Sequence, residues 1–464
     1  MSDVPAQLDL AATGDELYRL VERLYPICRS ITGSGVSQSL DILQSYIPLT
    51  RHTLRSGTQV FDWTIPDEWN LRRAVLRDPA GGVVVDSDQH NLHVLNYSVA
   101  LRRKVDFAEL RPHLFSIPDH PDWVPYRTSY YKPNWGFCLP DRQLQTLQPG
   151  AYDVDIDATL TPGVMTWGEL FLPGESADEM LISAHICHPS LANDNCSGLA
   201  VSTLLAMHLG SRRRKISYRF VFAPGTIGAI AWLAQNESHL HRLRAGLVIS
   251  CVGDNGPMTY KRSRRGNAEI DQVVERVLST SSKPHRIVDF IPFGYDERQY
   301  CSPGFNLPVG CLTRTPNGQY PEYHSSADNL SLMSRDGLAD SLATYLRVCE
   351  LLESGQFQGK ASRALPNDAR RSDQQIASDK TQDASPCYIN TLPRCEPQLG
   401  KRGLYQATGG LADPGAAQLA MLWLLNYSDG QHSLQDISRR SGIDLTLLMQ
   451  TVDLLKRHQL LVDL

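Results

Sequence analysis

The chain has 464 residues, of which 42% are hydrophobic, and it carries a formal net charge of −5 with a pI near 6.3. This length predicts two to four domains with sizeable cores, and the acidic balance argues against bulk binding of nucleic acid or of acidic membranes. The N-terminus is polar, no apolar run approaches the ~18 residues of a membrane span, and the ten cysteines do not suggest a disulfide framework. We therefore expect a cytoplasmic protein with a small or peptidic partner.

Two helices are predicted near the N-terminus, because apolar residues recur at helical spacing over residues 16–24 and 37–47. From about Phe61 to Tyr152 the sequence changes to short alternating segments and turns, which predicts a small β-rich unit. Its densest aromatic stretch contains Trp123, Tyr126, Tyr130, Tyr131, Trp135 and Phe137. Because aromatic side chains dominate core burial, we expect them to form the core of this unit. The alternative is a wall that stacks on a sugar or an aromatic substrate.

The most informative run, residues 185–198, reads His-Ile-Cys-His-Pro-Ser-Leu-Ala-Asn-Asp-Asn-Cys-Ser-Gly. An apolar strand-like segment precedes it and a helix-like one follows it. It therefore occupies a strand-to-helix turn, which is where open α/β folds place their ligands. Two imidazoles, His185 and His188, and the carboxylate of Asp194 suit a borderline metal such as zinc. The alternative is that the Asn-Asp-Asn turn caps the following helix.

Four buried strands and a helix are predicted around this turn. The apolar runs lie at residues 180–184, 218–222, 245–252 and 307–312, and the helical segment lies at 199–209. Polar residues of ligand type recur near the ends of these runs and in the loops beyond them: His185, His188, Asp194, Asp254, Asp296, Glu297 and His324. We therefore predict that a single crevice at the sheet edge collects these residues.

The order of these residues resembles the zinc aminopeptidase family, which carries a histidine, an aspartate in an Asn-Asp-Asn-x-Ser-Gly turn, a Glu-Glu pair, a second aspartate and a final histidine. Three phrases, at residues 185–195, 296–304 and 322–328, make the resemblance specific. It covers nearly the whole chain outside one linker. Within the family, the chain resembles most closely a bacterial aminopeptidase-like branch, often associated with polysaccharide-biosynthesis clusters, that adds an inserted domain and a C-terminal winged helix. The resemblance implies an α/β fold with a mixed sheet, and zinc as cofactor.

The resemblance also implies roles for individual residues. Metal binding falls to His185, Asp194, Asp254 and His324, with His188 as an added candidate. From their place in the predicted crevice, we assign substrate binding to Asp296, Arg298 and Tyr323. In the wider family an aspartate two places after the first histidine orients that ligand. Here the position is Cys187, which we interpret as a small buried hydrophobe.

The largest departure from the family lies at the Glu-Glu pair, whose first member takes a proton from the metal-bound water and whose second binds metal. This chain has Gly225 and Thr226 there. Thr226 removes one metal ligand unless His188 replaces it, which leaves one or two zinc ions open. Gly225 removes the general base, which is typically worth ~10²–10⁴-fold in rate. Because glycine leaves room for a larger side chain, Gly225→Glu is expected to restore the base.

Glu297 is the candidate substitute for the missing base. The alternative is that Glu297 binds the substrate amine while Arg298 and Asp296 form an ion pair that stabilises their loop. An acid near a free α-amino group suits an aminopeptidase, because the charge attraction in a water-poor cleft selects amino-terminal substrates.

Changes in composition and the resemblance together divide the chain into four parts. These are a zinc-aminopeptidase-like domain (1–60 and 153–355), an inserted β-rich domain (61–152), a flexible linker (356–387) and a winged-helix domain (388–464). The last part has predicted helices at 416–425, after Ser433 in the spacing Ser433-x-x-Asp436, and at 445–457. Its final helix lacks the basic face that phosphate contacts require. We expect this part to serve protein contacts, and the winged helix or the inserted domain to support a homo-oligomer. The alternative is DNA binding, which Arg439 and Arg440 keep open.

Three functions remain open from the sequence. The first is a zinc-dependent aminopeptidase-like hydrolase that cleaves an amide of an amino-terminal peptide or amino compound and is weakened by Gly225. The second is a non-catalytic, metal-containing binding or scaffold protein. The third is an amide-cleaving or amide-forming enzyme of a biosynthetic cluster.

Overall fold

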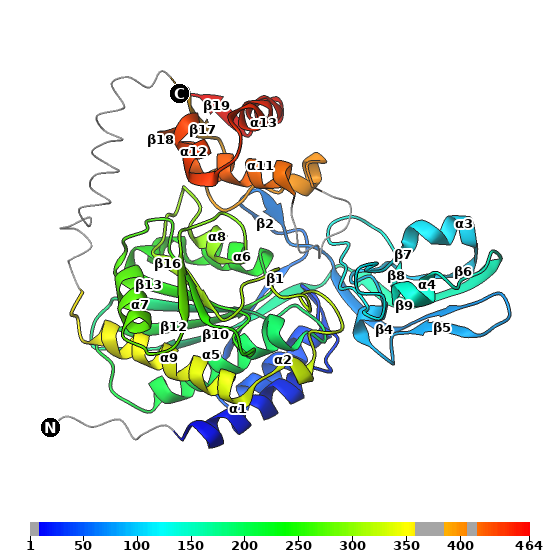
Figure 1. Ribbon diagram of the computed structural model, residues 1–464, viewed down its shortest axis with the longest axis horizontal. Coiled ribbons are helices and arrows are strands. Elements are labelled where there is room, and N and C mark those ends of the chain that lie inside the picture. The colour runs from blue at the N-terminus through cyan, green and yellow to red at the C-terminus, as the bar shows by residue number, and fades with distance from the viewer. Residues whose placement is uncertain (1–8, 358–384, 406–414) are drawn as a thin grey trace.

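A mixed eight-stranded sheet forms the centre of the computed structural model, which describes residues 9–357, 385–405 and 415–464 (Figure 1). In spatial order its strands are β1 (Thr50–Arg55), β10 (Val164–Leu172), β12 (Ser217–Ala223), β11 (Glu179–His185), β13 (Leu243–Ile249), β16 (Val309–Thr313), β14 (Met258–Lys261) and β15 (His285–Val288). The central strands β12, β11, β13 and β16 are parallel to one another. They are the four strands predicted from apolar runs, and both of their faces are covered, which explains their continuous apolar character.

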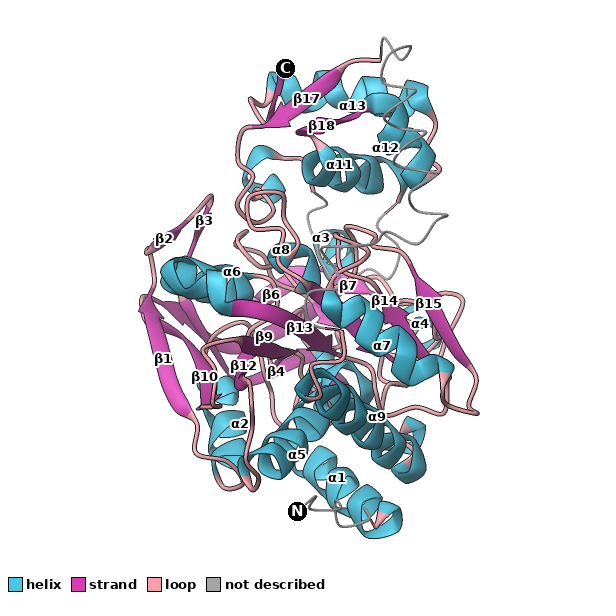
Figure 2. Ribbon diagram, turned by 90° about the vertical axis from the view of Figure 1, so that its left-hand side faces the viewer, coloured by secondary structure: helices cyan, strands magenta, loops and turns pink. Residues whose placement is uncertain are grey.

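Helices cover both faces of this sheet (Figure 2). On one face, a shared apolar cluster joins α1 (Leu10–Leu24), α2 (Ser34–Gln44), α5 (Gly198–Gly210), α7 (Glu269–Ser279) and α9 (Arg335–Glu353). On the other face lie α6 (Ile227–Asn236) and the short α8 (Glu297–Tyr300). Helix α1 begins six residues before the predicted start, because the Asp9 side chain accepts hydrogen bonds from the backbone N–H groups of Ala11 and Ala12.

A second, four-stranded antiparallel sheet projects from one side of the central sheet (Figure 1). Its strands, in spatial order, are β5 (Val83–Asp86), β4 (Glu68–Arg77), β9 (Ala151–Thr161) and β6 (Leu101–Asp106). Short elements accompany it: β2 (Gln59–Val60), β3 (Trp63–Thr64), β7 (Leu114–Phe115), β8 (Phe137–Cys138), α3 (Phe107–Leu110) and α4 (Asp141–Leu144). Strand β9 alternates buried and more exposed residues and pairs with β4 as far as Thr161, so this sheet continues past residue 152.

Over its described residues, the C-terminal part has a three-stranded sheet and three α-helices. They are β17 (Cys387–Asn390), α11 (Ala416–Tyr427), β18 (Asp429–Ser433), α12 (Leu434–Ser441), α13 (Leu445–Arg457) and β19 (Leu461–Asp463). The predicted capping box is present, since Ser433 Oγ accepts from Asp436 N at 3.1 Å and Asp436 Oδ2 accepts from Ser433 N at 3.0 Å. Most of the predicted linker, residues 358–384, lies outside the described residues. Among the described helices, none is both long enough and apolar enough to cross a membrane.

The C-terminal part contacts α8 directly. Arg298 Nη1 lies 2.8 Å from Glu396 Oε2, and the side chains of both residues are largely buried. The neighbouring Gln299 accepts a hydrogen bond from Glu396 N at 2.9 Å, and Trp63 donates one to the Glu396 carbonyl at 2.7 Å. The expected pair of Arg298 with Asp296 is therefore wrong: the helical turn directs the guanidinium towards Glu396 instead.

Candidate metal centre

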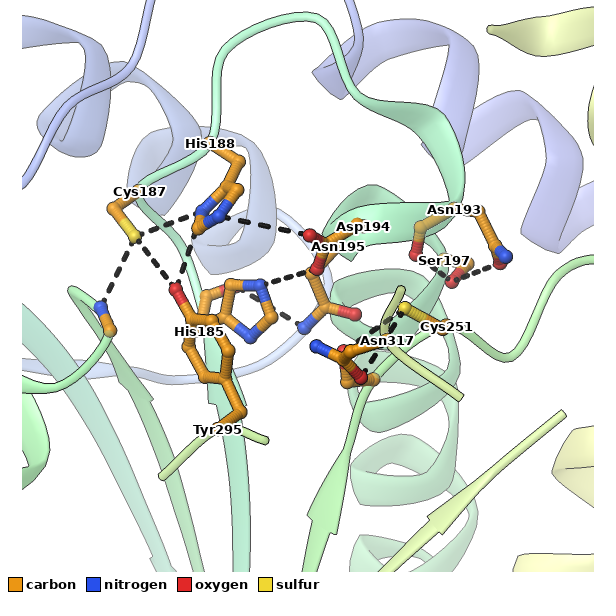
Figure 3. Close-up of polar contacts among 12 residues, drawn as sticks. His185, Cys187, His188, Asn193, Asp194, Asn195, Ser197, Cys251, Tyr295 and Asn317 are labelled. Atoms are coloured by element: carbon orange, nitrogen blue, oxygen red, sulfur yellow. Dashed lines mark hydrogen bonds and ion pairs between the residues drawn. The ribbon is translucent and has the colours of Figure 1, made fainter. Parts of the chain in front are cut away.

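One group of metal-ligand side chains stands out at the end of β11. His185 is the last residue of that strand, His188 follows in the loop, and Asp194 lies in the irregular turn before α5. Their ligand atoms all lie within 4.8 Å of one another, and among the described residues they form the single such group of three or more His, Cys, Asp and Glu side chains. All three residues are buried. The structure thus brings together the short-range part of the predicted site (Figure 3).

Asp194 is the centre of this group, with three imidazoles around its carboxylate. Its Oδ1 lies 2.8 Å from His185 Nε2, and its Oδ2 lies 3.0 Å from His324 Nε2 and 3.7 Å from His188 Nε2. Burial opposes ionisation of Asp194, but the neighbouring His188 and His185 rings lower its pKa well below the ordinary value. Burial also lowers the pKa values of His185 and His188, the latter strongly.

This donor set fits zinc. Neutral imidazoles and an ionised carboxylate are ligands that the metal prefers, and burial favours the neutral form of His185 and His188. His324 is distant in sequence from the other three residues. Its contact with Asp194 is of the kind that the predicted crevice requires. The residue types, their protonation and their convergence on one carboxylate therefore agree with a metal site.

Asp254 lies outside the group of three. Its Oδ2 accepts hydrogen bonds from Asn193 Nδ2 at 2.9 Å and Thr315 N at 3.3 Å, while its Oδ1 accepts from Thr315 Oγ1 at 2.9 Å and Gly256 N at 2.5 Å. These donors engage both carboxylate oxygens. In this arrangement Asp254 connects the loop after β13 to the residue that precedes Asp194.

Two residues that support the turn carrying Asp194 were not assigned roles from the sequence. Asp328 accepts hydrogen bonds from the backbone N–H groups of Asn193 at 2.6 Å and Asp194 at 3.0 Å. Arg29, which is 1% exposed, donates from Nε to the His188 carbonyl at 2.9 Å. Asp328 falls within one of the phrases that carry the family resemblance, but nothing in the local sequence around Arg29 distinguishes it from a surface arginine.

Aromatic rings pack against the imidazoles. Tyr323 stacks on His324 with ring centroids 3.9 Å apart. Tyr126, from the segment between β7 and β8, lies with its ring centroid 5.0 Å from that of His188 and 5.1 Å from that of His324. Its backbone N–H also donates to the His324 carbonyl at 2.7 Å. Tyr126 is 3% exposed, so this member of the aromatic stretch is both buried and part of the wall around the site.

The side chain of Glu297 is engaged elsewhere. It is fully buried and forms an ion pair with Lys261. The same carboxylate accepts hydrogen bonds from the backbone N–H of Tyr295, at 3.1 and 3.3 Å. The carboxylate is engaged by Lys261 and by the backbone N–H of Tyr295, so these contacts favour a structural role for Glu297 over that of a substitute base.

Tyr295 occupies the space beside Gly225. A Cβ atom built on residue 225 would lie 2.5 Å from Cζ of Tyr295 and closer still to its hydroxyl oxygen. The expectation that glycine leaves room for a glutamate is therefore wrong. The Tyr295 ring is itself fixed, because it stacks on His185 with centroids 3.6 Å apart and an interplanar angle of 24°. Burial raises the pKa of Tyr295 well above 10, which keeps its hydroxyl protonated.

Asp296 lies beside this position, and its Oδ1 accepts a hydrogen bond from Thr226 N at 2.6 Å. Burial raises the pKa of Asp296 from 3.8 to about 7, and Glu297 adds to the shift. The folded protein therefore binds this proton more tightly than the unfolded chain does, so the contribution of Asp296 to stability falls as the pH rises from about 4 to about 7.

Asp296→Asn should remove this part of the pH dependence. Because asparagine does not ionise and keeps an oxygen for Thr226 N, we expect the variant to be more stable than the parent at about pH 8, by at most about 4 kcal/mol. Urea unfolding at about pH 5 and about pH 8 measures the difference. An equal loss of stability in parent and variant between these two pH values would contradict the assignment.

A cavity of about 140 Å³ lies on the β15 side of the site. Its lining includes Lys261, Arg286, Phe293, Glu297 and Asn317. Glu297 connects the cavity to the Tyr295 loop through the backbone hydrogen bond. On the opposite side, Asn317 Oδ1 lies 3.9 Å from Cys251 Sγ, close to the metal group (Figure 3). Through Glu297 the cavity borders the loop of Tyr295, the residue that stacks on His185.

The fold is that of the zinc aminopeptidases, as the sequence predicted. A zinc aminopeptidase from Bacillus subtilis superposes with a TM-score of 0.55 over 75% of this chain and 97% of its own, at 13% identity. A peptidase M28 precursor from Shewanella amazonensis superposes with a TM-score of 0.52 over 74% and 95%, at 15% identity. At these identities the likeness concerns the fold.

The chain belongs to the family described as "Domain of unknown function (DUF4910)", whose model matches residues 18–355. A winged helix-turn-helix model matches residues 386–463, which confirms the predicted module. A Clostridium acetobutylicum protein, "Putative polysaccharide biosynthesis protein with aminopeptidase-like domain", is 45% identical over 449 residues, 97% of this chain and 96% of the relative. A solved structure of a "putative peptidase" from the same species has 43% identity and a TM-score of 0.73, covering 98% of each chain.

Proposed function

We propose that this protein is a zinc-dependent, peptidase-like hydrolase that cleaves an amide of an amino-terminal peptide or amino compound. The observation that carries this proposal is the convergence of three imidazoles on the buried carboxylate of Asp194. A zinc ion bound there would polarise the scissile carbonyl and lower the pKa of a bound water. The fold, shared with zinc aminopeptidases, supports the same reaction class.

The proposal gives the side chains separate roles. His185, His188, Asp194 and His324 hold the metal, and Asp254 supports the turn that carries Asp194. The adjacent cavity receives the substrate group next to the scissile bond. We also propose that the inserted unit shapes access to the site, because it supplies Tyr126 to the wall. The roles of Asp296, Arg298 and Tyr323 in substrate binding remain part of the proposal.

A specific observation favours a second candidate, a non-catalytic binding protein with the same metal site. The protonated phenol of Tyr295 fills the space of the expected base, and Glu297 is paired with Lys261. Tyr295 carries its proton, and the Glu297 carboxylate is engaged by Lys261 and the Tyr295 N–H, so neither group takes the place of the expected base. In this case the metal and the cavity would bind an amino-terminal ligand without cleaving it.

The two candidates are separated by measuring release of amino acids from a panel of aminoacyl amides and short peptides. We expect slow hydrolysis that a chelator abolishes and added zinc restores. His185→Ala should lose it, whereas His208→Ala, which removes a histidine at the distant end of α5, should retain it. Stoichiometric zinc without turnover of any substrate would favour the binding protein, and absence of zinc binding would reject both.

A further inference from the structure

The Nδ1 atom of His188 faces two side chains that can each donate or accept a hydrogen bond. Cys187 Sγ lies 3.1 Å from it and Tyr295 Oη lies 3.4 Å from it. The same two partners are 3.5 Å from each other, and Cys187 Sγ also accepts a hydrogen bond from Gly225 N at 3.2 Å. Figure 3 shows the thiol and the phenol on the side of the His188 ring opposite Asp194. The ring is therefore held between these two groups and the carboxylate.

This arrangement accommodates the tautomer of His188 that a metal ligand at Nε2 requires. A neutral imidazole presents a lone pair at Nε2 only when its proton is on Nδ1, and the partner of Nδ1 decides which form prevails. A phenol and a thiol can each donate or accept a hydrogen bond, so both could accept from Nδ1–H when a metal takes the lone pair of Nε2. The Nε2 atom then faces Asp194 Oδ2, 3.7 Å away, with its lone pair available to a metal.

Tyr295 acts on His185 in a different way. Nδ1 of His185 is buried and has no hydrogen-bond partner among the described residues. Its ring is instead covered by the Tyr295 ring, whose centroid lies 3.6 Å away. One residue thus fixes two imidazoles, His185 through ring stacking and His188 through a hydroxyl group. Only a residue without a side chain at position 225 leaves space for it.

We propose that Tyr295 is a positioning residue of the metal centre, which with Cys187 orients His188 as a metal ligand. His188 thereby supplies a ligand where Thr226 cannot. The proposal rests on the proposed function, since it concerns the same zinc site. Gly225 therefore has two effects. It removes the expected base, and it leaves space for the Tyr295 phenol that orients His188.

Tyr295→Phe tests the hydroxyl, because it keeps the ring that stacks on His185. We expect the zinc dissociation constant, measured by competition with a chelator, to rise about tenfold, within the 10–100-fold typical of lost partners of metal ligands. The double variant Tyr295→Phe/Cys187→Ala should approach about 100-fold. Tyr300→Phe is the matched control. It removes a buried hydroxyl from the same segment, one that bonds Ser183 at 2.9 Å, and should leave zinc affinity unchanged.

Cobalt substitution gives a readout that a general loss of stability would not move. If His188 leaves the coordination sphere, the visible absorption spectrum of the cobalt protein should change in Tyr295→Phe and stay unchanged in Tyr300→Phe, at full metal loading. Parent-like zinc affinity and an unchanged spectrum in Tyr295→Phe would overturn the inference while the zinc site stands. A parent protein that binds no zinc would instead overturn the proposed function.

Discussion

Replacing Asp194 by asparagine is expected to abolish stoichiometric zinc binding. His185, His188 and His324 all approach this carboxylate, which brings the negative charge of the donor set. Its loss should weaken binding by more than the ~10–100-fold that partners of ligands contribute. Elemental analysis after dialysis against zinc-free buffer measures the effect.

Asp254→Asn provides the comparison for this variant. Because Asp254 is engaged by Asn193, Gly256 and Thr315, its replacement should lower zinc affinity less than the Asp194 substitution does. Circular dichroism of both variants checks that the fold persists. Retention of stoichiometric zinc by a folded Asp194→Asn protein would contradict the site assignment. A larger loss in Asp254→Asn than in Asp194→Asn would show that Asp254 is itself a dominant ligand.

The second large effect concerns position 225, where Gly225→Glu alone should be destabilising. The new Cβ overlaps the Tyr295 hydroxyl, and the ring cannot easily yield because it stacks on His185. Overpacking of this kind typically costs about 1–3 kcal/mol. Urea unfolding should therefore show reduced stability, and the single variant should gain no hydrolysis over the parent.

Removing the Tyr295 side chain should allow Gly225→Glu to raise hydrolysis. In Gly225→Glu/Tyr295→Ala the glutamate has space near the metal group, and at saturating zinc we expect hydrolysis to rise by up to ~10²–10⁴-fold. Tyr295→Ala alone is the control, because it loosens the imidazoles without supplying a base. A single Gly225→Glu variant that is as stable as the parent and more active would show that Tyr295 moves aside readily, which contradicts the packing argument.

The parts of the fold that follow from local pattern were predictable. The strands β11, β12, β13 and β16 appear in the sequence as apolar runs because both faces of the sheet are buried. His185, His188 and Asp194 lie within one short turn, so the connection between strand and helix alone forces them together. The spacing of Ser433 and Asp436 likewise predicted the start of a helix.

The parts that depend on packing between distant segments were not predictable. Whether Glu297 faces the site or Lys261 depends on where β14 lies in the sheet, and these two residues are far apart in sequence. The sequence did not predict the role of Tyr295, because a single tyrosine in a loop is not part of a periodic pattern. The role of Tyr295 depends on the absence of a side chain at Gly225, which is 70 residues away in sequence but adjacent in space.

The contact between Arg298 and Glu396 links the C-terminal part to the segment that contains Tyr295. Arg298 belongs to the same short segment as Tyr295 and Asp296, and its charge is largely buried against Glu396. Removing only the Glu396 carboxylate, as in Glu396→Ala, would leave that guanidinium largely buried without its partner, a situation that typically costs about 3–5 kcal/mol. The segment beside the metal centre and the C-terminal module are therefore thermodynamically coupled, so that a ligand which stabilises one should slow local opening of the other.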